Sequence, residues 1–146
     1  MQISSRFTIA IHIITCIETF KDDYKTTSDF LAASVNVNPV VIRRILQQLK
    51  KAKIVETKRG SGGTIAAKPL DEITFYDVYK AVDCVEGDLF HFHENPNSKC
   101  PVGRNIHFVL DDRLRDVQNT MESKLKEIKL SDVVCDTIKL IEGENK

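Results

Sequence analysis

The feature that most constrains the fold is a helix with one basic face that leads directly into a glycine-rich hairpin. Asn38 followed by Pro39 predicts the helix start, because Asn accepts from exposed amides and Pro removes an N–H that would have no partner there. At about 100° per residue, the helix expected from Pro39 to about Ala52 has an apolar face and an opposite basic face. The apolar face holds Val41, Ile42, Ile45, Leu46, Leu49 and Ala52, and the opposite face holds Val40, Arg43, Arg44, Gln47 and Lys51.

A shorter helix precedes this one. The segment TSDFLAAS predicts a helix with Thr27 or Ser28 as its N-cap, and VNVN predicts a turn. Two helices joined by a turn of about four residues are typical of a helix-turn-helix. Taken alone, the basic face would also suit an ordinary solvated surface helix.

The segment after the helix-turn-helix predicts a β-hairpin. Residues 54–58 and 64–68 form its arms, and Pro69 ends the second arm. Gly60, Gly62 and Gly63 supply the tip, where positive φ is needed more than once. A phosphate-binding P-loop is excluded, because its glycines must lead into a helix and these lead into a strand.

A hairpin placed directly after a helix-turn-helix is a winged helix, which favours DNA binding. We expect the basic helix in the major groove, with Val40 against a thymine methyl group, and the Arg59 side chain at the minor groove. Helix starts supply further phosphate contacts. The predicted DNA-binding residues are Ser5, Arg6, Thr27, Ser28, Asn38, Val40, Arg43, Arg44, Gln47, Lys58, Arg59, Gly60 and Ser61.

The charge distribution agrees with DNA binding by the first half of the chain. The whole chain is neutral, yet residues 1–70 hold 11 Lys and Arg against 5 Asp and Glu. The remainder is acidic to the same extent, so only the first half offers a surface for a polyanion. No run approaches the roughly 20 apolar residues of a membrane span, and the N-terminus lacks the features of a secretory signal. We therefore expect a cytoplasmic protein with no membrane partner.

The remaining elements complete the first unit and add a second. A helix from about Ile3 to Phe20 and another from about Thr74, with Asp77 in a capping box, are expected to pack in a winged-helix domain spanning residues 1–85. Residues 86–103 are polar and contain Pro and Gly, which indicates a linker or sensor loop. Residues 104–130 predict a long helix, and residues 131–146 a tail that packs on a partner chain or frays.

The long helix carries apolar residues at heptad spacing. They are Ile106, Leu110, Leu114, Val117, Met121, Leu125 and Ile128, with steps of four and three. Such a seam can pack on its own domain. A two-fold dimer is favoured, because helix-turn-helix proteins commonly bind two half-sites one DNA turn apart. The fold class is therefore mainly α with a small β-hairpin wing, plus a long C-terminal dimerisation helix.

The chain resembles the bacterial winged-helix regulators typified by IscR, NsrR and CymR. The resemblance covers residues 1 to about 133 and rests on ISSRFTIAIHI, NPVVIRRILQQLKKAKIVETKRGSGG, LDEITFYDVYKAVD and CPVGRNI. It implies homodimers that bind palindromic promoter sites in double-stranded DNA. The cluster-binding branch uses three cysteines in the loop before the long helix. This chain has only Cys100 there, with Cys84 before it, so we expect no iron–sulfur cluster and no other cofactor.

Cys100 is a candidate redox sensor. It lies at the start of the long helix beside Lys99 and Arg104, and a helix N-terminus and cations favour a thiolate. We expect a repressor that responds to oxidants or electrophiles through this thiol. An alternative is a metal-responsive regulator that uses His91, His93 and Cys100.

Two further alternatives use other chemistry. A winged helix can serve as a protein-interaction adaptor, which would show no salt-dependent affinity for duplex DNA. A thiol peroxidase with Cys100 as nucleophile would need a base, and the one candidate, His107, lies in a helix whose seam is used for packing. The prediction is therefore that the chain is not an enzyme.

Overall fold

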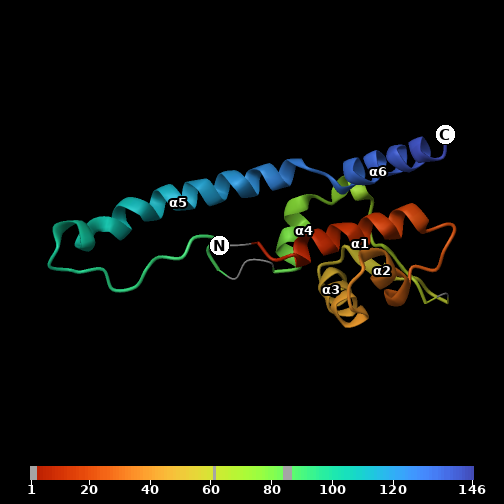
Figure 1. Cartoon of the computed structure of the whole chain (residues 1–146), viewed down its shortest axis with the longest axis horizontal. Coiled ribbons are helices and arrows are strands. Elements are labelled where there is room, and N and C mark those ends of the chain that lie inside the picture. Colours follow the sequence, from red (N-terminus) through yellow and green to blue (C-terminus); the bar gives the residue numbers. More distant parts are fainter. Residues whose placement is uncertain (1–2, 61, 84–86) are drawn as a thin grey trace.

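The computed structural model describes residues 3–60, 62–83 and 87–146, and its fold class is the one expected: mainly helical with one small hairpin. The elements in chain order are α1 (Arg6–Phe20), α2 (Ser28–Val35), α3 (Pro39–Lys51), β1 (Val55–Thr57), β2 (Thr64–Ala66), the 3-10 helix η1 (Leu70–Glu72), α4 (Phe75–Ala81), α5 (Pro101–Glu127) and α6 (Leu130–Glu144). Figure 1 shows a globular part built on α1 to α4 and a long arm formed by α5. Within the described residues, no helix is long and apolar enough to span a membrane.

The hydrophobic core is built around α1. Its inner face buries Ala10, Ile14 and Ile17, and the residues packed with them come from every other element of the globular part. Fully buried partners include Leu31, Ile42, Ile45, Leu49, Ile54, Ile73, Val78 and Leu130. Burial of side chains of this size stabilises a fold by about 1.5–3 kcal/mol each.

The buried face of α3 is narrower than its apolar pattern suggests. Ile42, Ile45, Leu46 and Leu49 are buried as expected, whereas Val41 and Ala52 are exposed. Val41 lies in the first turn of α3 and Ala52 is its C-cap, so both lie at ends of the helix that extend beyond the core.

Local capping explains where the short helices begin. The Thr27 side chain accepts from the Phe30 backbone N–H, and the Asn38 side chain accepts from the Val40 backbone N–H at 2.9 Å. Thr74 and Asp77 form the expected capping box at α4. These three sites confirm the predicted helix starts at α2, α3 and α4.

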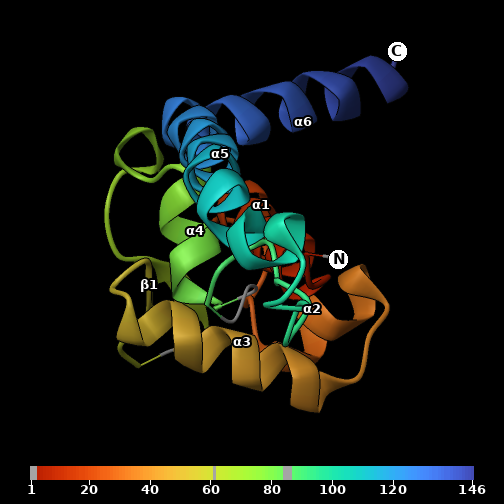
Figure 2. The same ribbon diagram turned by 90° about the vertical axis from the view of Figure 1, so that its left-hand side faces the viewer.

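The long helix begins earlier than expected and leaves the globular part. Cys100 is the N-cap and Pro101 is the first residue, because a Pro at this position has its φ already set for a helix. The 27 residues span about 40 Å at 1.5 Å per residue, and every one of them is partly or fully exposed. Figure 1 shows residues 87–100 running outward beside this arm to its far end, from which α5 returns, and Figure 2 looks along the arm.

The C-terminal segment folds on its own chain. The expected alternatives for this tail were packing on a partner or fraying, but it forms α6, which packs against α1 and buries Leu130 and Val134. The α5–α6 junction is held by backbone bonds from Phe75 N to Ile128 O and from Leu130 N to Ile73 O, both 2.9 Å. The C-terminal end of the predicted dimer seam of α5 therefore packs on its own chain.

The two ends of that seam have different surroundings. Met121 and Leu125 pack against the core of their own chain, and Ile128 lies at the junction just described. Ile106, Leu110 and Leu114 are half-exposed, and Val117 is 52% exposed. The part of the seam that is open to a partner is therefore residues 106–117.

Candidate nucleic-acid interface

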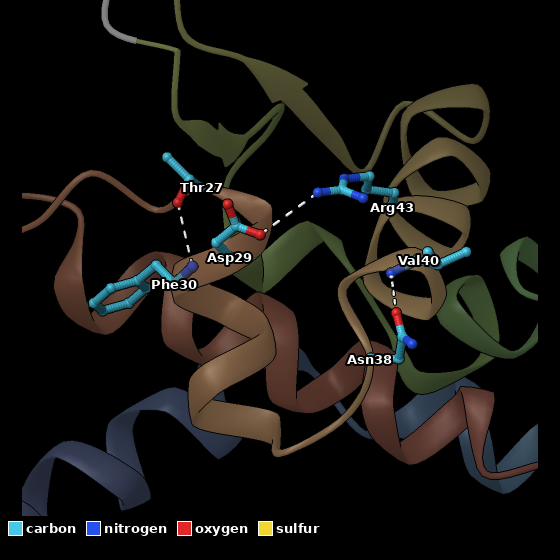
Figure 3. A network of polar contacts seen from close by, with 6 residues as sticks. All are labelled: Thr27, Asp29, Phe30, Asn38, Val40 and Arg43. Atoms are coloured by element: carbon cyan, nitrogen blue, oxygen red, sulfur yellow. Dashed lines mark hydrogen bonds and ion pairs between the residues drawn. The ribbon is translucent and has the colours of Figure 1, made fainter.

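The outer face of α3 presents a basic and amide-bearing surface. Arg43, Arg44 and Gln47 are exposed, and Val40 is 56% exposed at the N-terminal end of the same helix. Figure 3 shows the Asn38 side chain turned back onto the Val40 amide, while Arg43 extends toward α2. Asn38 therefore acts first as a cap, and its side-chain NH2 group is a donor that suits a base or phosphate acceptor.

Arg43 has an acidic neighbour that sequence reasoning missed. Its Nη2 lies 3.5 Å from Oδ1 of Asp29, in the first turn of α2, and both side chains are largely exposed (Figure 3). The pair crosses the gap between the two helices of the motif. An exposed pair of this kind contributes about 0–1 kcal/mol to stability, so its importance lies in where it holds the guanidinium.

The wing is a two-stranded antiparallel hairpin with the expected tip. Val55 pairs with Ala66 and Thr57 with Thr64, and Lys58 N donates to Gly63 O at 2.8 Å. Gly60 has φ +80° and Gly62 has φ +73°, which confirms the need for glycine at both positions. Lys58 and Arg59 are exposed beside the tip. Ser61, also predicted to contact DNA, lies outside the described residues.

Thr26 fixes the wing to the helix-turn-helix. Thr26 Oγ1 donates to Thr64 O at 2.6 Å, and Thr64 N donates to Thr26 O at 3.1 Å. Both threonines are buried. Gly63 lies close to this pairing, since a Cβ there would be in van der Waals contact with Thr26 N at 3.4 Å. Thr26 immediately precedes the N-cap of α2, so the wing and the first helix of the motif are held in one arrangement.

A hollow with both lysine and aspartate side chains in its wall lies beside the wing. It has a volume of about 250 Å³ and is lined by the loop between α1 and α2 and by the hairpin. Lys21, Lys25 and Lys58 contribute to its wall, together with Asp22 and Asp23. Lys21 and Lys25 were not singled out in the sequence, because neither lies in a helix-turn-helix or wing motif. Lys21 is paired with Glu18 at 2.5 Å and adds little net charge, whereas Lys25 places a positive charge next to the predicted phosphate contacts.

The predicted phosphate contacts at helix starts differ in their surroundings. Thr27 and Ser28 begin α2, although the Thr27 hydroxyl already accepts from Phe30 N at 3.2 Å. Ser5 is an exposed N-cap of α1 that makes no side-chain cap bond. Arg6 instead donates from Nη2 to Asp83 O at 2.8 Å, which ties α1 to the end of α4. We expect Arg6 to hold these two helices together.

Cys100 lies apart from the α3 surface, at the end of the arm that is far from the globular part (Figure 1). It is exposed, and the nearby backbone N–H groups of Gly103 and Val102 lower the pKa of its thiol, although the sulfur makes no side-chain cap hydrogen bond. The expected effect of the helix N-terminus is therefore present. The neighbouring Lys99 and Arg104 do not contribute to that shift. A lowered pKa increases the thiolate fraction at neutral pH.

The histidine-rich loop does not assemble a metal site in the described part of the chain. His93 contacts the His107 ring edge-on with centroids 5.5 Å apart, and Phe92 lies 4.8 Å from the same ring. Among residues 3–60, 62–83 and 87–146, no group of three or more His, Cys, Asp or Glu side chains could hold a metal ion. His91, His93 and Cys100 are therefore not brought together as the metal-responsive alternative requires.

Comparison with known proteins identifies the family to which this chain belongs. A model of the Rrf2 family, described as iron-dependent transcriptional regulators, matches residues 3–136. The chain belongs to the Rrf2 family. It is 45% identical over 133 residues to the "Putative HTH-type transcriptional regulator YwnA" of Bacillus subtilis, covering 91% of this chain and 97% of that one.

Solved structures agree with the Rrf2 assignment. A crystal structure of a "putative DNA binding protein" matches with a TM-score of 0.71 and 40% identity, covering 88% of this chain and 98% of the other. IscR from T. potens has the same fold, with a TM-score of 0.69, 18% identity, and coverage of 94% and 88%. The chain is therefore a DNA-binding transcriptional regulator of helix-turn-helix type, and the resemblance seen in the sequence is confirmed.

The Rrf2 description raises the question of iron. Cys16 is buried in α1, Cys100 caps α5 and Cys135 lies on α6, so these three thiols belong to separate elements. Cys84 lies outside the described residues. An iron–sulfur cluster needs several thiolates at one place. The described donors do not fit such a cluster.

Proposed function

We propose that this Rrf2 protein is a homodimeric repressor that binds a palindromic promoter site and releases it when Cys100 is oxidised. The observation that carries the DNA-binding part is the pairing of Thr26 with Thr64. It holds the arginine-bearing wing against the segment that begins α2, so the recognition helix and the wing are presented as one unit. The α3 side chains read base edges, and the wing contacts the backbone.

The exposed arm supports the homodimer. Val117 is 52% exposed, and Ile106, Leu110 and Leu114 on the same face are half-exposed, on a helix with no buried residue. A long helix gains most of its stability from packing an amphipathic face, and apolar surface of this kind marks an interface. A second copy packed along residues 106–117 would cover this face. Two-fold symmetry would then present two winged helices to two half-sites.

Cys100 links the arm to a chemical signal. Its thiolate would attack one oxygen of hydrogen peroxide, forming the S–O bond of a sulfenic acid as the O–O bond breaks and hydroxide leaves. The hydroxide takes up a proton from solvent and becomes water. The product adds a polar group at the first turn of α5, where Gly103 and Val102 N–H groups now stabilise the thiolate. A change in this turn would alter how the far end of the arm packs on the second copy, and with it the spacing of the two recognition helices.

The test begins by sequencing DNA fragments that co-purify with the native chain. A labelled duplex of the enriched sequence is then titrated with the native protein and with Arg43→Ala and Arg59→Ala, before and after treatment with hydrogen peroxide. The proposal expects salt-dependent binding that both variants weaken. It also expects peroxide to release DNA from native protein while Cys100→Ser stays bound. Equal binding to any duplex, or release of both forms by peroxide, contradicts it.

The direction of regulation needs a cellular readout. A reporter gene placed behind the enriched promoter should be silent when the regulator is present and active when it is deleted. A reporter that requires the regulator for expression would overturn the repressor assignment while leaving DNA binding intact.

A further inference from the structure

A groove on the side of α1 that faces α6 contains an unassigned cluster of polar side chains. The groove has a volume of about 390 Å³ and is walled by α1, α6 and the end of α2. This size lies in the range of small-molecule sites, which are mainly apolar with a few converging polar groups. Ile11, Phe20, Val133 and Ile141 supply apolar wall.

The polar cluster is a thiol, a hydroxyl and an imidazole in a chain of contacts. Cys16 Sγ lies 3.1 Å from Ser34 Oγ, and Ser34 Oγ lies 3.1 Å from His12 Nε2. All three residues line the groove, although Cys16 is only 5% exposed. With the thiol donating to Ser34 and Ser34 donating to His12, the cluster can pass a proton from sulfur to the imidazole.

Two observations indicate what kind of molecule would enter. The groove lining contains no Asp, Glu, Lys or Arg among the residues that the structure describes, so it favours an uncharged ligand. Thr19 Oγ1, also in the lining, is shielded from solvent and has no hydrogen-bond partner in the described part of the chain. An unpaired buried hydroxyl costs free energy that a ligand carbonyl would recover.

From this geometry we propose that the groove binds a small uncharged quinone or enone, which Cys16 captures covalently. For a quinone, Cys16 Sγ forms a bond to a ring carbon while the thiol proton moves through Ser34 to His12. The electrons of the ring double bond move to a carbonyl oxygen, which takes up a proton. Loss of the ring hydrogen to the second oxygen yields a hydroquinone thioether. The reaction is an addition, so it needs no other oxidant and has no leaving group.

The site differs from Cys100 in the class of reagent that it admits. Cys100 is exposed and meets any water-soluble oxidant, whereas Cys16 is reached only through an apolar groove. An adduct there would separate α6 from α1. Because α6 continues from the arm, that movement would change how the arm meets the DNA-binding unit. This regulatory consequence rests on the proposed function, but the capture chemistry does not.

The test uses full-length variants that keep a single thiol. One variant retains Cys16, with Ser at positions 84, 100 and 135, and a matched control retains exposed Cys135 instead. Each reacts with methyl-1,4-benzoquinone, and the adduct is followed by intact-protein and peptide mass spectrometry. His12→Gln is added to both, because Gln keeps a hydrogen-bond partner for Ser34 and takes up no proton.

The expected result is one quinone on Cys16, with a rate that falls at least about tenfold with His12→Gln, in keeping with the usual size of general-base catalysis. The rate at Cys135 should not change with the same substitution. The proposal is overturned if no adduct forms on Cys16 in the folded protein, or if the reaction rate at Cys16 does not change with His12→Gln. Melting curves of every variant confirm that each is folded. The mass measurement uses no DNA, so its failure is separate from a failure of promoter binding.

Discussion

Asp29 holds Arg43 on the recognition surface: Oδ1 of the first lies 3.5 Å from Nη2 of the second, across the two helices of the helix-turn-helix. A carboxylate in this position serves two purposes. It orients the guanidinium toward α2, and it places a negative charge where a phosphate backbone would approach. Both effects oppose indiscriminate binding, since non-specific affinity comes mainly from phosphate neutralisation.

Asp29→Asn should therefore increase affinity for DNA of any sequence. Removing one negative charge from the surface and freeing Arg43 is expected to tighten binding to random duplex by about two- to tenfold. Stability should change by less than about 1 kcal/mol, because the pair is exposed. Fluorescence anisotropy with random and specific duplexes measures both affinities. Asp71→Asn, in η1 beside α6, is the matched control and should leave both unchanged.

Arg59→Ala should reduce the salt dependence of binding. The exposed Arg59 side chain lies at the wing tip, and each lost phosphate contact lowers the slope of log K against log salt by about 1. Titrations between low and moderate salt give this slope. Lys139→Ala, on α6, removes the same charge outside the interface and should keep the native slope. Identical slopes for native protein and Arg59→Ala would show that the wing makes no phosphate contact through Arg59.

Gly63→Val should loosen the wing. A Cβ there would already be in van der Waals contact with Thr26, 3.4 Å from its N and 3.6 Å from its Oγ1, so the γ-methyl groups of Val are expected to crowd the pairing of Thr26 with Thr64. Crowding of this kind costs about 1–3 kcal/mol, measurable by urea denaturation. Gly143→Ala is the control, because a Cβ there meets nothing within 4 Å in α6. It should stabilise the protein by up to about 1 kcal/mol.

Val117→Asp should separate the proposed dimer. It places a charge in the exposed stretch of the α5 seam, where a partner helix would have to desolvate it. Sedimentation should give a dimer dissociation constant at least about tenfold higher than that of the native protein. Asn119→Asp adds the same charge about 200° further round the helix and should leave the dimer intact. A native protein that sediments as a monomer would contradict the interface directly.

Cys100 should react at a lower pH in the folded protein than in the unfolded chain. The backbone N–H groups of Gly103 and Val102 lower the pKa of its thiol, so the thiolate persists as pH falls below the ordinary midpoint. In a variant with Ser at positions 16, 84 and 135, the rate of alkylation by iodoacetamide is measured against pH with and without urea. The midpoint should lie lower without urea. Coincident midpoints would show that the helix start does not favour the thiolate.

The features that could be predicted from the sequence are those set by residues close in the chain. The Asn38 cap, the Thr74–Asp77 capping box and the positive φ at Gly60 and Gly62 depend on neighbours within a few positions. The amphipathic pattern of α3 correctly predicted most of its buried face. Composition and spacing were sufficient at these places because local geometry determines the conformation there.

The features that were missed depend on contacts between distant segments. Thr26 meets Thr64 across 38 positions, and Arg6 meets Asp83 across 77. The C-terminal helix packs on α1 because α5 turns at Ile128 and the chain bonds back to residues 73–75, which no periodicity of the tail reveals. The proximity of Asp29 to Arg43 likewise follows from how α2 crosses α3. Nothing in either helix alone indicates it.

The most direct test of the central claim is the stoichiometry of the regulator on its enriched promoter duplex, measured by sedimentation velocity. The account predicts a dimer in free solution and a complex of two chains per duplex. It also predicts that Arg43→Ala, while still dimeric, loses the complex at moderate salt. One chain per duplex, or a native complex unaffected by Arg43→Ala, would contradict it.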